Sequence, residues 1–458
     1  MHLVERFAQY AVGSRTRALT PQVLHHAKRA VIDWFAALLP GAEVPPATLM
    51  RQAFASELRQ HEGGARLAPG NPGAPARLAA LINGTAAHTA EVDDIFRDGI
   101  YHPGAPTIAA ALALAEERGA SGEDFLRAVI VGYEISTRIG ATMGRAHYEY
   151  WHNTGTIGCF GAAAAAAELL QLDETRFAHA LATVATFSAA LQQAFRMDSM
   201  SKPLHAGRAA EAGITAALMA AEGVTGSLDV LEGAAGFGKA LTAGSVGVDW
   251  SNTCATLGQD FHITRMTFKN HACCGHTFAA IDGALHLQRT HGLTADEVSS
   301  IELGSYRASV EVSGVENPRT PAEGRFSIKY VVATALRYGS VRLAAFERAQ
   351  LDDPATRVLM GKITAGVDAE LDAAFPKQRA ARVRITTTDG RVLAHLQATR
   401  KGDPDAPLTD TELDDKFREL ATPVLGPVRT GALLPYLWQL EAHPTLAQLW
   451  RLNQAQTA

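Results

Sequence analysis

Five short stretches of this chain concentrate side chains that can move a proton or hold an anion. The first contains Glu91, Asp93 and Asp94, followed at a short distance by His102. Carboxyl groups that share a pocket raise one another's pKa, and a raised pKa suits a carboxyl group to proton transfer near neutral pH. A solvated loop in which one aspartate caps a helix has the same composition. The stretch therefore indicates either acid–base chemistry or a helix cap.

Two further stretches place basic side chains where an alanine-rich helix is predicted to begin. His152 and Thr154 lie in WHNTGTIG, ahead of CFGAAAAAAELL, and Lys202 and His205 lie in MSKPLHAGRAA. The first turn of a helix has unpaired N–H groups and a partial positive charge, so it attracts anions. A lysine at the same end is unfavourable unless an anion accompanies it. Both stretches favour an anion site, and an ordinary helix start with a capping or surface residue is the alternative.

The last two stretches also precede predicted helices. KNHACCGHT contains Lys269, Cys274 and His276, and GRFSIKY contains Arg325 and Tyr330. A helix N-terminus lowers the pKa of a cysteine, so the first of the two suits anion binding or catalysis. Its spacing matches no standard set of zinc ligands, and the chain has no CxxC pair and no HExxH motif, so we expect no metal. For GRFSIKY, a helix start with solvated charges is an equally simple interpretation.

The sequence lacks the motifs that bind nucleotides or activate an acyl-enzyme nucleophile. No GxGxxG follows a predicted strand, and the chain contains neither a complete P-loop nor a GxSxG turn. We therefore expect no cofactor.

The composition is that of a globular protein and argues against several classes of partner. The chain has 458 residues, of which 47% are hydrophobic and 19% charged, and this length favours two domains. A net charge of −5 with scattered Lys and Arg provides no basic face for nucleic acid. The apolar stretches are shorter than a membrane span, and the N-terminal residues do not resemble a secretory signal. Four cysteines are too few for a disulfide framework, so we expect a cytoplasmic protein.

Hydrophobic spacing predicts a mainly α fold, with a large all-helical domain and a second, smaller α+β domain. In the first half we predict helices over residues 21–39, 76–90, 105–118, 122–138, 157–170, 173–194, 206–222 and 227–232. Further on, the predicted strands are 298–306, 381–388 and 391–398, the last two joined by Asp389-Gly390, among helices at 277–290, 327–336 and around 344–375. We therefore expect an all-helical domain over residues 1–260, completed by C-terminal helices at 405–458, and an α+β domain over residues 261–404.

Taken in order, the five stretches resemble the 2-methylcitrate dehydratase (MmgE/PrpD) family, which also includes cis-aconitate decarboxylase and iminodisuccinate epimerase. The matching segments are EVDDIF with the following HPG, WHNTGTIGCFGAAAAA, MSKPLHAGRAAEAGITAALMAAEGVTG, KNHACCGHTFAAIDG and RFSIKY. The resemblance implies a large all-helical domain with a smaller α+β domain, chemistry without a cofactor, a homodimer, and a small polycarboxylate as the substrate. The reactions of the family share the addition or removal of a proton at a carbon beside a carboxylate.

The resemblance also implies roles for individual residues. His102 and Lys269 become candidates for proton transfer, and His152 and Lys202 become candidates for holding the substrate and stabilising developing charge. The remaining candidates are Glu91, Cys274 and His276 for catalysis, and Asp93, Thr154, His205, Arg325 and Tyr330 for substrate binding.

Three departures from the usual motifs of the family fall on the expected pocket. EVDD stands in place of DFDD, WHNT in place of WHPT, and KNHACCGH in place of KxYPxC or KxFPxH followed by a histidine. We therefore expect a substrate that differs from those of the best-studied members. The leading expectation is a hydro-lyase that dehydrates a 2-methylcitrate-like di- or tricarboxylate. The alternatives are an epimerase of an imino-dicarboxylate, a decarboxylase of a cis-aconitate-like acid, and a non-catalytic anion-binding protein.

Overall fold

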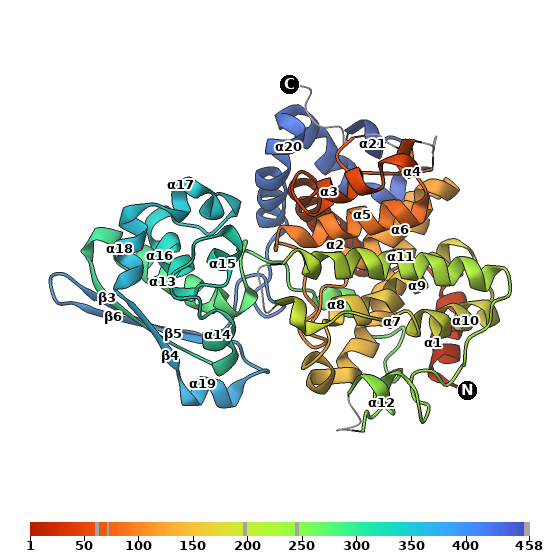
Figure 1. Cartoon of the computed structure of the whole chain (residues 1–458), viewed down its shortest axis with the longest axis horizontal. Helices are drawn as coiled ribbons and strands as arrows, with labels where there is room; N and C mark the ends of the chain where they lie inside the picture. The colour runs from red at the N-terminus through yellow and green to blue at the C-terminus, as the bar shows by residue number, and fades with distance from the viewer. Residues whose placement is uncertain (60–63, 71–72, 196–198, 243–246, 453–458) are drawn as a thin grey trace. The chain divides into compact units, whose positions relative to one another are not determined.

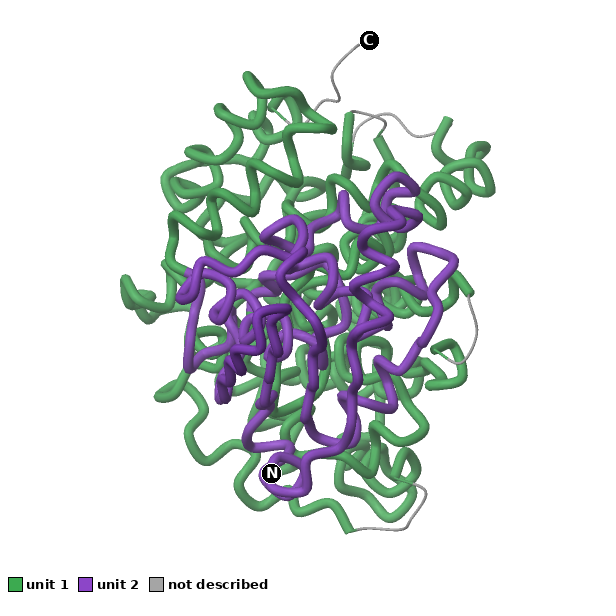
Figure 2. The backbone as a smooth tube through the Cα atoms, turned by 90° about the vertical axis from the view of Figure 1, so that its left-hand side faces the viewer, with its two compact units in different colours: residues 1–267, 409–458 green, residues 268–408 purple. Residues whose placement is uncertain are grey.

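The computed structural model describes residues 1–59, 64–70, 73–195, 199–242 and 247–452 (Figure 1). The chain divides into two compact units, one formed by residues 1–267 with 409–458 and the other by residues 268–408 (Figure 2). The described residues are mainly helical, which confirms the predicted fold class at that level. None of the described helices combines the length and the apolar character that a membrane span requires. Residues 453–458 of the predicted C-terminal helices lie outside the described residues.

The larger unit is built from long helices, most of which the hydrophobic spacing predicts. They are α1 (Leu3–Ser14), α2 (Pro21–Ala42), α5 (Ala76–Thr89), α6 (Gly104–Arg118), α7 (Gly122–Tyr148), α9 (Gly158–Leu169), α10 (Glu174–Ala185), α11 (Ser201–Ala221) and α20 (Asp410–Trp438) (Figure 1). Helix α11 packs against α5 and α9, and α20 packs against α2. The chain therefore returns to this unit at its end, after it has formed the smaller unit.

Small residues let the central helices of the larger unit approach closely. The alanine run of α9 is buried throughout. A Cβ atom on Gly213 of α11 would lie 2.4 Å from the Cβ of Ala162, and one on Gly207 would lie 2.0 Å from the carbonyl oxygen of Leu81. Real carbon atoms do not approach so closely, so glycine at both positions is what allows α11 to lie against α9 and α5.

Two helical predictions in this unit are wrong in part or entirely. The helix predicted for residues 173–194 ends at Ala185, because the residues that follow pair with a distant loop. Leu191 forms a bridge with Trp151, and the Ala190 carbonyl accepts a hydrogen bond from the His152 N–H at 2.9 Å. The helix predicted for residues 227–232 is a series of turns instead, since the glycines that follow it favour turns over helix.

The smaller unit contains a four-stranded sheet with the order β4-β3-β5-β6. Strands β3 (Val298–Ser305), β5 (Ala381–Thr387) and β6 (Val392–Gln397) confirm the three predicted strands, and β5 and β6 form the predicted antiparallel hairpin. Gly390 in its turn has φ +87°, a value that glycine adopts without strain. Helix α13 (Phe278–His291) packs on β5 and β6, and α16 (Ile328–Tyr338) packs on α13.

One strand of this sheet lies where the sequence predicts helix. Strand β4 (Ile363–Val367) pairs parallel with β3, within the region around 344–375. Its short sequence, ITAGV, is too short for its spacing to identify a strand. Pairing with β3 therefore decides its structure, as tertiary context often does for short strands.

Candidate active site

The larger unit gathers polar side chains from four segments of the chain into one group, which we call the histidine cluster. Its members are His88 from the last turn of α5, Glu91, Asp93 and His102 from the loop between α5 and α6, His152 just before the short helix α8 (Asn153–Thr156), and Lys202 and His205 from the first turns of α11. Helix ends supply most of these positions. The packing of α5, α6 and α11 on one another therefore fixes the backbone that carries the cluster.

Asp93 is the anionic centre of the histidine cluster. Its Oδ2 atom lies 2.7 Å from Nδ1 of His88, with which it forms a hydrogen bond, and 3.1 Å from Nδ1 of His102. Burial acts to raise the pKa of Asp93, but His102 and His88 outweigh it and hold that pKa well below its ordinary value. Asp93 is therefore ionised at neutral pH. Its carboxylate holds the His88 ring by a hydrogen bond and faces the His102 ring.

Burial keeps the imidazoles next to this centre neutral. It lowers the pKa of His88 to about 3 and the pKa of His152 well below the ordinary value. The rings of His88 and His152 stack with their centroids 5.4 Å apart, and Nδ1 of His152 lies 3.0 Å from Nδ1 of His205. Burial and the charge of Lys202 together lower the pKa of His205 to about 4. These three rings can therefore donate or accept hydrogen bonds at pH 7 without carrying charge.

Lys202 brings a positive charge to the cluster and forms an ion pair with Glu91. The two side chains are largely buried, with 14% and 10% of their surfaces exposed. Glu91 has φ +60°, which is uncommon for a residue other than glycine and turns the chain at the start of the acidic loop. The Nζ atom of Lys202 also lies 5.4 Å from the centroid of the Phe195 ring. The protein itself thus supplies the anion that a lysine at a helix start requires.

The loop that carries His102 is attached to the helix start that carries Thr154. The Oγ1 atom of Thr154 accepts a hydrogen bond from the His102 backbone N–H at 3.2 Å, and Nδ2 of Asn153 donates to the Gly99 carbonyl at 2.7 Å. The asparagine of WHNT therefore holds this loop in place. Thr154 is fully buried and positions His102, and substrate binding by Thr154 stays a prediction.

Asp94 anchors the same loop through two hydrogen bonds. It accepts hydrogen bonds from the Tyr133 hydroxyl at 2.8 Å and from the Gly104 N–H at 3.0 Å. Burial and the neighbouring charge of Asp33 raise its pKa to about 7. A Cβ atom on Gly104 would lie 2.8 Å from Oδ1 of Asp94, which is why glycine follows His102 and Pro103 in this loop.

A buried lysine of α20 provides a second anchor. Nζ of Lys416 donates to Oδ1 of Asp33 at 2.5 Å and to the Val92 carbonyl at 2.6 Å. The side chains of Lys416 and Asp33 are 1% and 0% exposed. Although Lys416 opposes it, burial raises the pKa of Asp33 to about 6. This ion pair fixes the backbone immediately before Asp93.

Part of the histidine cluster has the spacing of a metal site. One ligand atom each from His88, Asp93 and His102 lies within 4.8 Å of the others. Two imidazoles and a carboxylate suit a transition metal such as Zn²⁺. The same groups also satisfy one another through Oδ2 of Asp93. Metal binding and proton transfer are therefore alternatives for this group, and a chelator distinguishes them.

His88 is a member of the cluster that sequence reasoning missed. It lies in AAHTAEVDD, where a lone histidine near a helix end has no pattern of its own. Its proximity in sequence to the acidic loop is the signal that could have identified it. A histidine in the last turn of a helix can contact a carboxylate in the loop that follows.

The smaller unit holds the predicted residues of the KNHACCGHT stretch. Lys269 is 2% exposed, and the Cys274 N–H donates to the Arg325 carbonyl at 3.0 Å, so these two predicted stretches meet. Burial raises the pKa of the neighbouring Cys273 to about 12, although Lys269 and Arg325 both act to lower it. Cys273 is therefore a neutral thiol at pH 7.

Two residues that the sequence does not single out complete this region. Nδ1 of His276 lies 2.9 Å from the hydroxyl of Tyr306, and Arg400 donates to the Gly275 carbonyl at 2.7 Å. Arg400 is itself buried in an ion pair with Asp403, at 2.6 Å. Both Tyr306 and Arg400 come from segments without a recognisable motif.

In the smaller unit, Tyr330 is buried and Arg325 is half-buried. The Tyr330 hydroxyl donates a hydrogen bond to the Ala345 carbonyl, and the Arg325 guanidinium lies 5.3 Å from the centroid of the Phe346 ring. Each side chain thus has a partner within the fold. Substrate binding by either residue stays a prediction.

Comparison with known proteins relates both units to one family. The chain matches the MmgE/PrpD N-terminal domain over residues 5–247 and the MmgE/PrpD C-terminal domain over residues 271–438. It is 28% identical to the cis-aconitate decarboxylase-like protein oryM of Aspergillus oryzae, over 94% of this chain and 92% of that protein. It is 27% identical to the cis-aconitate decarboxylase of Homo sapiens, over 96% of this chain and 92% of that protein. It is also 27% identical to the cis-aconitate decarboxylase of Aspergillus terreus, over 97% of this chain and 94% of that protein.

Proposed function

Because the chain belongs to the MmgE/PrpD family, we propose that it is a lyase that acts on a small polycarboxylate without a cofactor. Proton transfer takes place at the histidine cluster, at a carbon beside a substrate carboxylate. The observation that carries the proposal is the 3.1 Å contact between ionised Asp93 and His102, beside neutral imidazoles and the cation of Lys202.

In this proposal His102 moves the proton. Its Nδ1 atom faces Asp93, so its Nε2 atom is the one that exchanges a proton with the substrate. A carboxylate in this position fixes the tautomer and the orientation of the ring, as it does in hydrolase triads. The hydrogen bond from the His102 N–H to Thr154 holds the backbone as well.

Lys202 and the neutral histidines bind the substrate. A substrate carboxylate shares the Lys202 ammonium with Glu91 or displaces Glu91 from it. His152 and His205 donate hydrogen bonds to a second carboxylate, and these bonds become stronger as negative charge develops on the carbon skeleton. Lys269, Cys274 and His276 stay candidates for catalysis.

Decarboxylation of a cis-aconitate-like acid is the first reaction to test. Two relatives matched over nearly their whole length are named cis-aconitate decarboxylase, and a third is named cis-aconitate decarboxylase-like. In this reaction the bond to one carboxylate breaks, CO₂ leaves, and its electron pair passes to the carbon skeleton, which takes up one proton. A trianion and a proton thus give a dianion and CO₂. Dehydration, which the sequence motifs favour, is the second candidate, since it begins with removal of a proton beside a carboxylate.

The test is proton NMR in D₂O with the purified full chain. The panel contains cis-aconitate, citrate, 2-methylcitrate, itaconate and iminodisuccinate. We expect deuterium to appear at one carbon of one compound, accompanied by loss of CO₂. Loss of water would favour dehydration instead, and inversion at one carbon would favour epimerisation. Binding with no exchange in any compound would overturn the proposal in favour of an anion-binding protein.

Variants then locate the chemistry. His102→Gln is expected to abolish exchange, whereas His291→Gln, which changes an exposed histidine at the end of α13, leaves it unchanged. Lys269→Met, Cys274→Ser and His276→Gln in the same assay test the remaining candidates one at a time. Exchange at the wild-type rate in His102→Gln would show that the histidine cluster is not the catalytic site.

A further inference from the structure

A cavity of about 140 Å³ lies in the larger unit, apart from the residues of the histidine cluster. The C-terminal half of α1, the segment that leads into α2, the first half of α7 and a loop that includes Gly258 and Phe261 form its walls. Its volume is about ten times what one ordered water needs. The cavity therefore has room for a ligand of several heavy atoms.

Most of the cavity wall is apolar. Ile130 and Val131 of α7 line it and are buried, and Leu19 and Phe261 contribute further apolar surface. An aliphatic group in this space would be removed from water, and each buried CH₂ group favours binding.

Three of the polar side chains around the cavity are already committed to the fold. Ser14 donates to the Ala11 carbonyl at 2.7 Å, and Thr20 caps α2 by accepting a hydrogen bond from the Val23 N–H. Arg127 donates to the carbonyls of Ser14 and Arg17 and forms an ion pair with Glu123. These groups build the wall and leave little hydrogen-bonding capacity for a ligand.

Arg17 and Tyr10, which also line the cavity, differ from these three residues in having side chains without such partners among the described residues. Within the part of the chain that the structure describes, the Arg17 guanidinium and the Tyr10 hydroxyl have no hydrogen-bond or ion-pair partner. The two groups are near each other: a Cβ atom on Gly258 would lie 3.1 Å from Cε2 of Tyr10 and 3.9 Å from Nη1 of Arg17. Burial raises the pKa of Tyr10 above its ordinary value, so its hydroxyl remains a donor. Arg17 is exposed and Tyr10 is half-buried, so one cation and one neutral donor border the apolar space.

We propose that this cavity is a binding site for a small aliphatic monocarboxylate, separate from the histidine cluster. The carboxylate accepts hydrogen bonds from the Arg17 guanidinium and the Tyr10 hydroxyl, and the aliphatic chain lies against Ile130 and Val131. One uncommitted cation matches one carboxylate, whereas a polycarboxylate would place a second charge against apolar side chains. The proposal does not depend on the reaction that the histidine cluster carries out.

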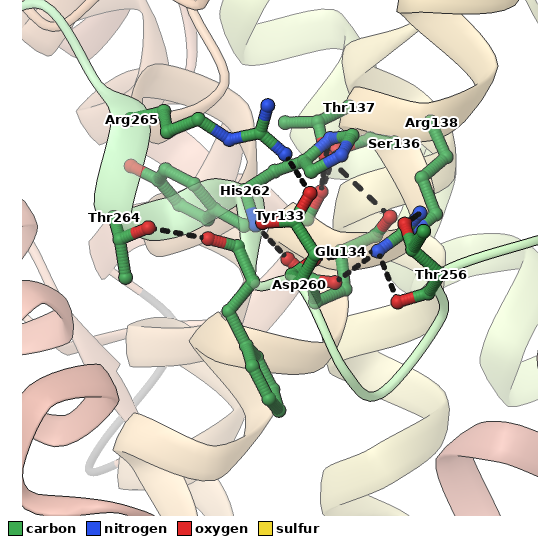
Figure 3. A network of polar contacts seen from close by, with 11 residues as sticks. Tyr133, Glu134, Ser136, Thr137, Arg138, Thr256, Asp260, His262, Thr264 and Arg265 are labelled. Atoms are coloured by element: carbon green, nitrogen blue, oxygen red, sulfur yellow. Dashed lines mark hydrogen bonds and ion pairs between the residues drawn. The ribbon is translucent and has the colours of Figure 1, made fainter. Parts of the chain in front are cut away.

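The wall that contains Phe261 is held in place before any ligand arrives. Arg138 donates to the carbonyls of Asp260 at 2.7 Å and Thr256 at 3.1 Å, and Glu134 accepts a hydrogen bond from the His262 N–H (Figure 3). Glu134 and Arg138 form a buried ion pair on α7, on the same helix as Ile130 and Val131. Binding therefore requires little rearrangement of this wall, which favours affinity.

The experiment is titration of the full chain with butyrate, followed by saturation-transfer NMR and by calorimetry. Butyramide, which keeps the shape without the charge, and inorganic phosphate, which keeps a charge without the chain, are run in parallel. We expect saturable binding of butyrate only. Equal binding of butyramide, or binding of phosphate in place of butyrate, would overturn the assignment of the ligand class.

Four variants locate the binding. Arg17→Gln is expected to weaken butyrate binding at least about tenfold and Tyr10→Phe by about three- to tenfold, because they remove a charged and a neutral donor. Ala18→Trp puts a large side chain at a residue that lines the cavity, and it is expected to weaken butyrate binding by reducing the space for the ligand. Arg118→Gln, the matched change of another exposed arginine, leaves binding unchanged. Unaltered binding in Arg17→Gln and Ala18→Trp would overturn the proposal.

A last variant separates this site from the proposed active site. Lys202→Met is expected to retain butyrate binding, and cis-aconitate is expected not to displace butyrate from the wild-type protein. Loss of butyrate binding in Lys202→Met would show that the monocarboxylate binds at the histidine cluster instead. The outcome of the exchange assay has no bearing on this result.

Discussion

Two buried histidine–aspartate pairs in this molecule have nearly the same contact and different surroundings. Nδ1 of His88 lies 2.7 Å from a carboxylate oxygen of Asp93 in the larger unit, and Nε2 of His271 lies 2.9 Å from one of Asp282 in the smaller unit. In the first pair, the same carboxylate oxygen also contacts His102.

In the second pair, groups of the fold contact the other carboxylate oxygen and the imidazole ring. The other oxygen of Asp282 accepts a hydrogen bond from the Lys401 backbone N–H at 2.8 Å, and the Phe278 ring packs edge-on against His271. The comparison shows that such a pair is a common structural unit. It becomes a candidate for chemistry when a further titratable group shares the carboxylate, as His102 does at Asp93.

The largest expected effect is that of replacing His102, the group that distinguishes the first pair from the second. His102→Gln is expected to lower kcat by about 10²–10⁴-fold, because it removes the group that exchanges the proton. His271→Gln, the matched change in the second pair, is expected to reduce stability and to leave kcat close to that of the wild type. Steady-state kinetics on the substrate found by NMR, together with thermal unfolding, separate the two effects. A similar loss of kcat in both variants would contradict the distinction between the pairs.

The next effect concerns the ion pair that fixes the loop beside Asp93. Lys416→Met is expected to lower the free energy of unfolding by about 3–5 kcal/mol, because it leaves Asp33 buried without its cation. The control is Lys28→Met, whose partner Glu441 is about a third exposed, and it should cost no more than about 1 kcal/mol. Urea unfolding at pH 7 measures both. Equal costs would show that burial does not distinguish these ion pairs.

A smaller effect is expected in the second pair. Asp282→Asn removes the charge and retains the shape, so it should cost about 1–3 kcal/mol of stability through weaker hydrogen bonds to His271 and Lys401. Activity should remain. Urea unfolding and kinetics on the same preparation test this, and an inactive but fully stable Asp282→Asn would assign a functional role to this pair.

The pH dependence of stability sharpens the comparison further. His88 is protonated in the unfolded chain below about pH 6.5, but the folded protein keeps it neutral down to about pH 3. Unfolding therefore takes up a proton between these values, so the contribution of His88 is complete above pH 6.5 and is lost as the pH falls toward 3. His88→Gln should show a shallower rise of unfolding free energy between pH 4 and 6.5 than the wild type. Parallel curves would contradict the assigned state of His88.

The smallest expected effect is that of a chelator. If His88, Asp93 and His102 work through proton transfer, prolonged treatment with EDTA should leave turnover unchanged. Loss of activity that returns on addition of Zn²⁺ or another transition metal would show that these residues hold an ion.

The sequence predicts the elements of this fold where local preference and packing agree. Helix α5, α6 and the β5–β6 hairpin lie within one or two residues of their predicted bounds. The errors occur where distant partners decide the structure. Residues after Ala185 leave the helix to pair with the loop at Trp151, and β4 forms because β3 lies beside it. Neither partner can be read from local spacing.

The candidate site was predictable to a similar degree. The motifs identify Asp93, His102 and Lys202, because several of their residue types stand out against apolar neighbours. They do not reveal that Glu91 pairs with Lys202, since this contact joins two segments far apart in the sequence. They miss His88 altogether, because a single histidine in a helix carries no motif.

The return of α20 to the larger unit has a consequence for synthesis on the ribosome. Lys416 is translated after the whole of the smaller unit, yet it is the cation for Asp33 and a support for the loop at Val92. A nascent chain therefore carries Asp33 without its cation until α20 emerges. We expect a chain that stops at residue 408 to remain sensitive to protease around the acidic loop, and addition of a peptide spanning α20 to restore protection.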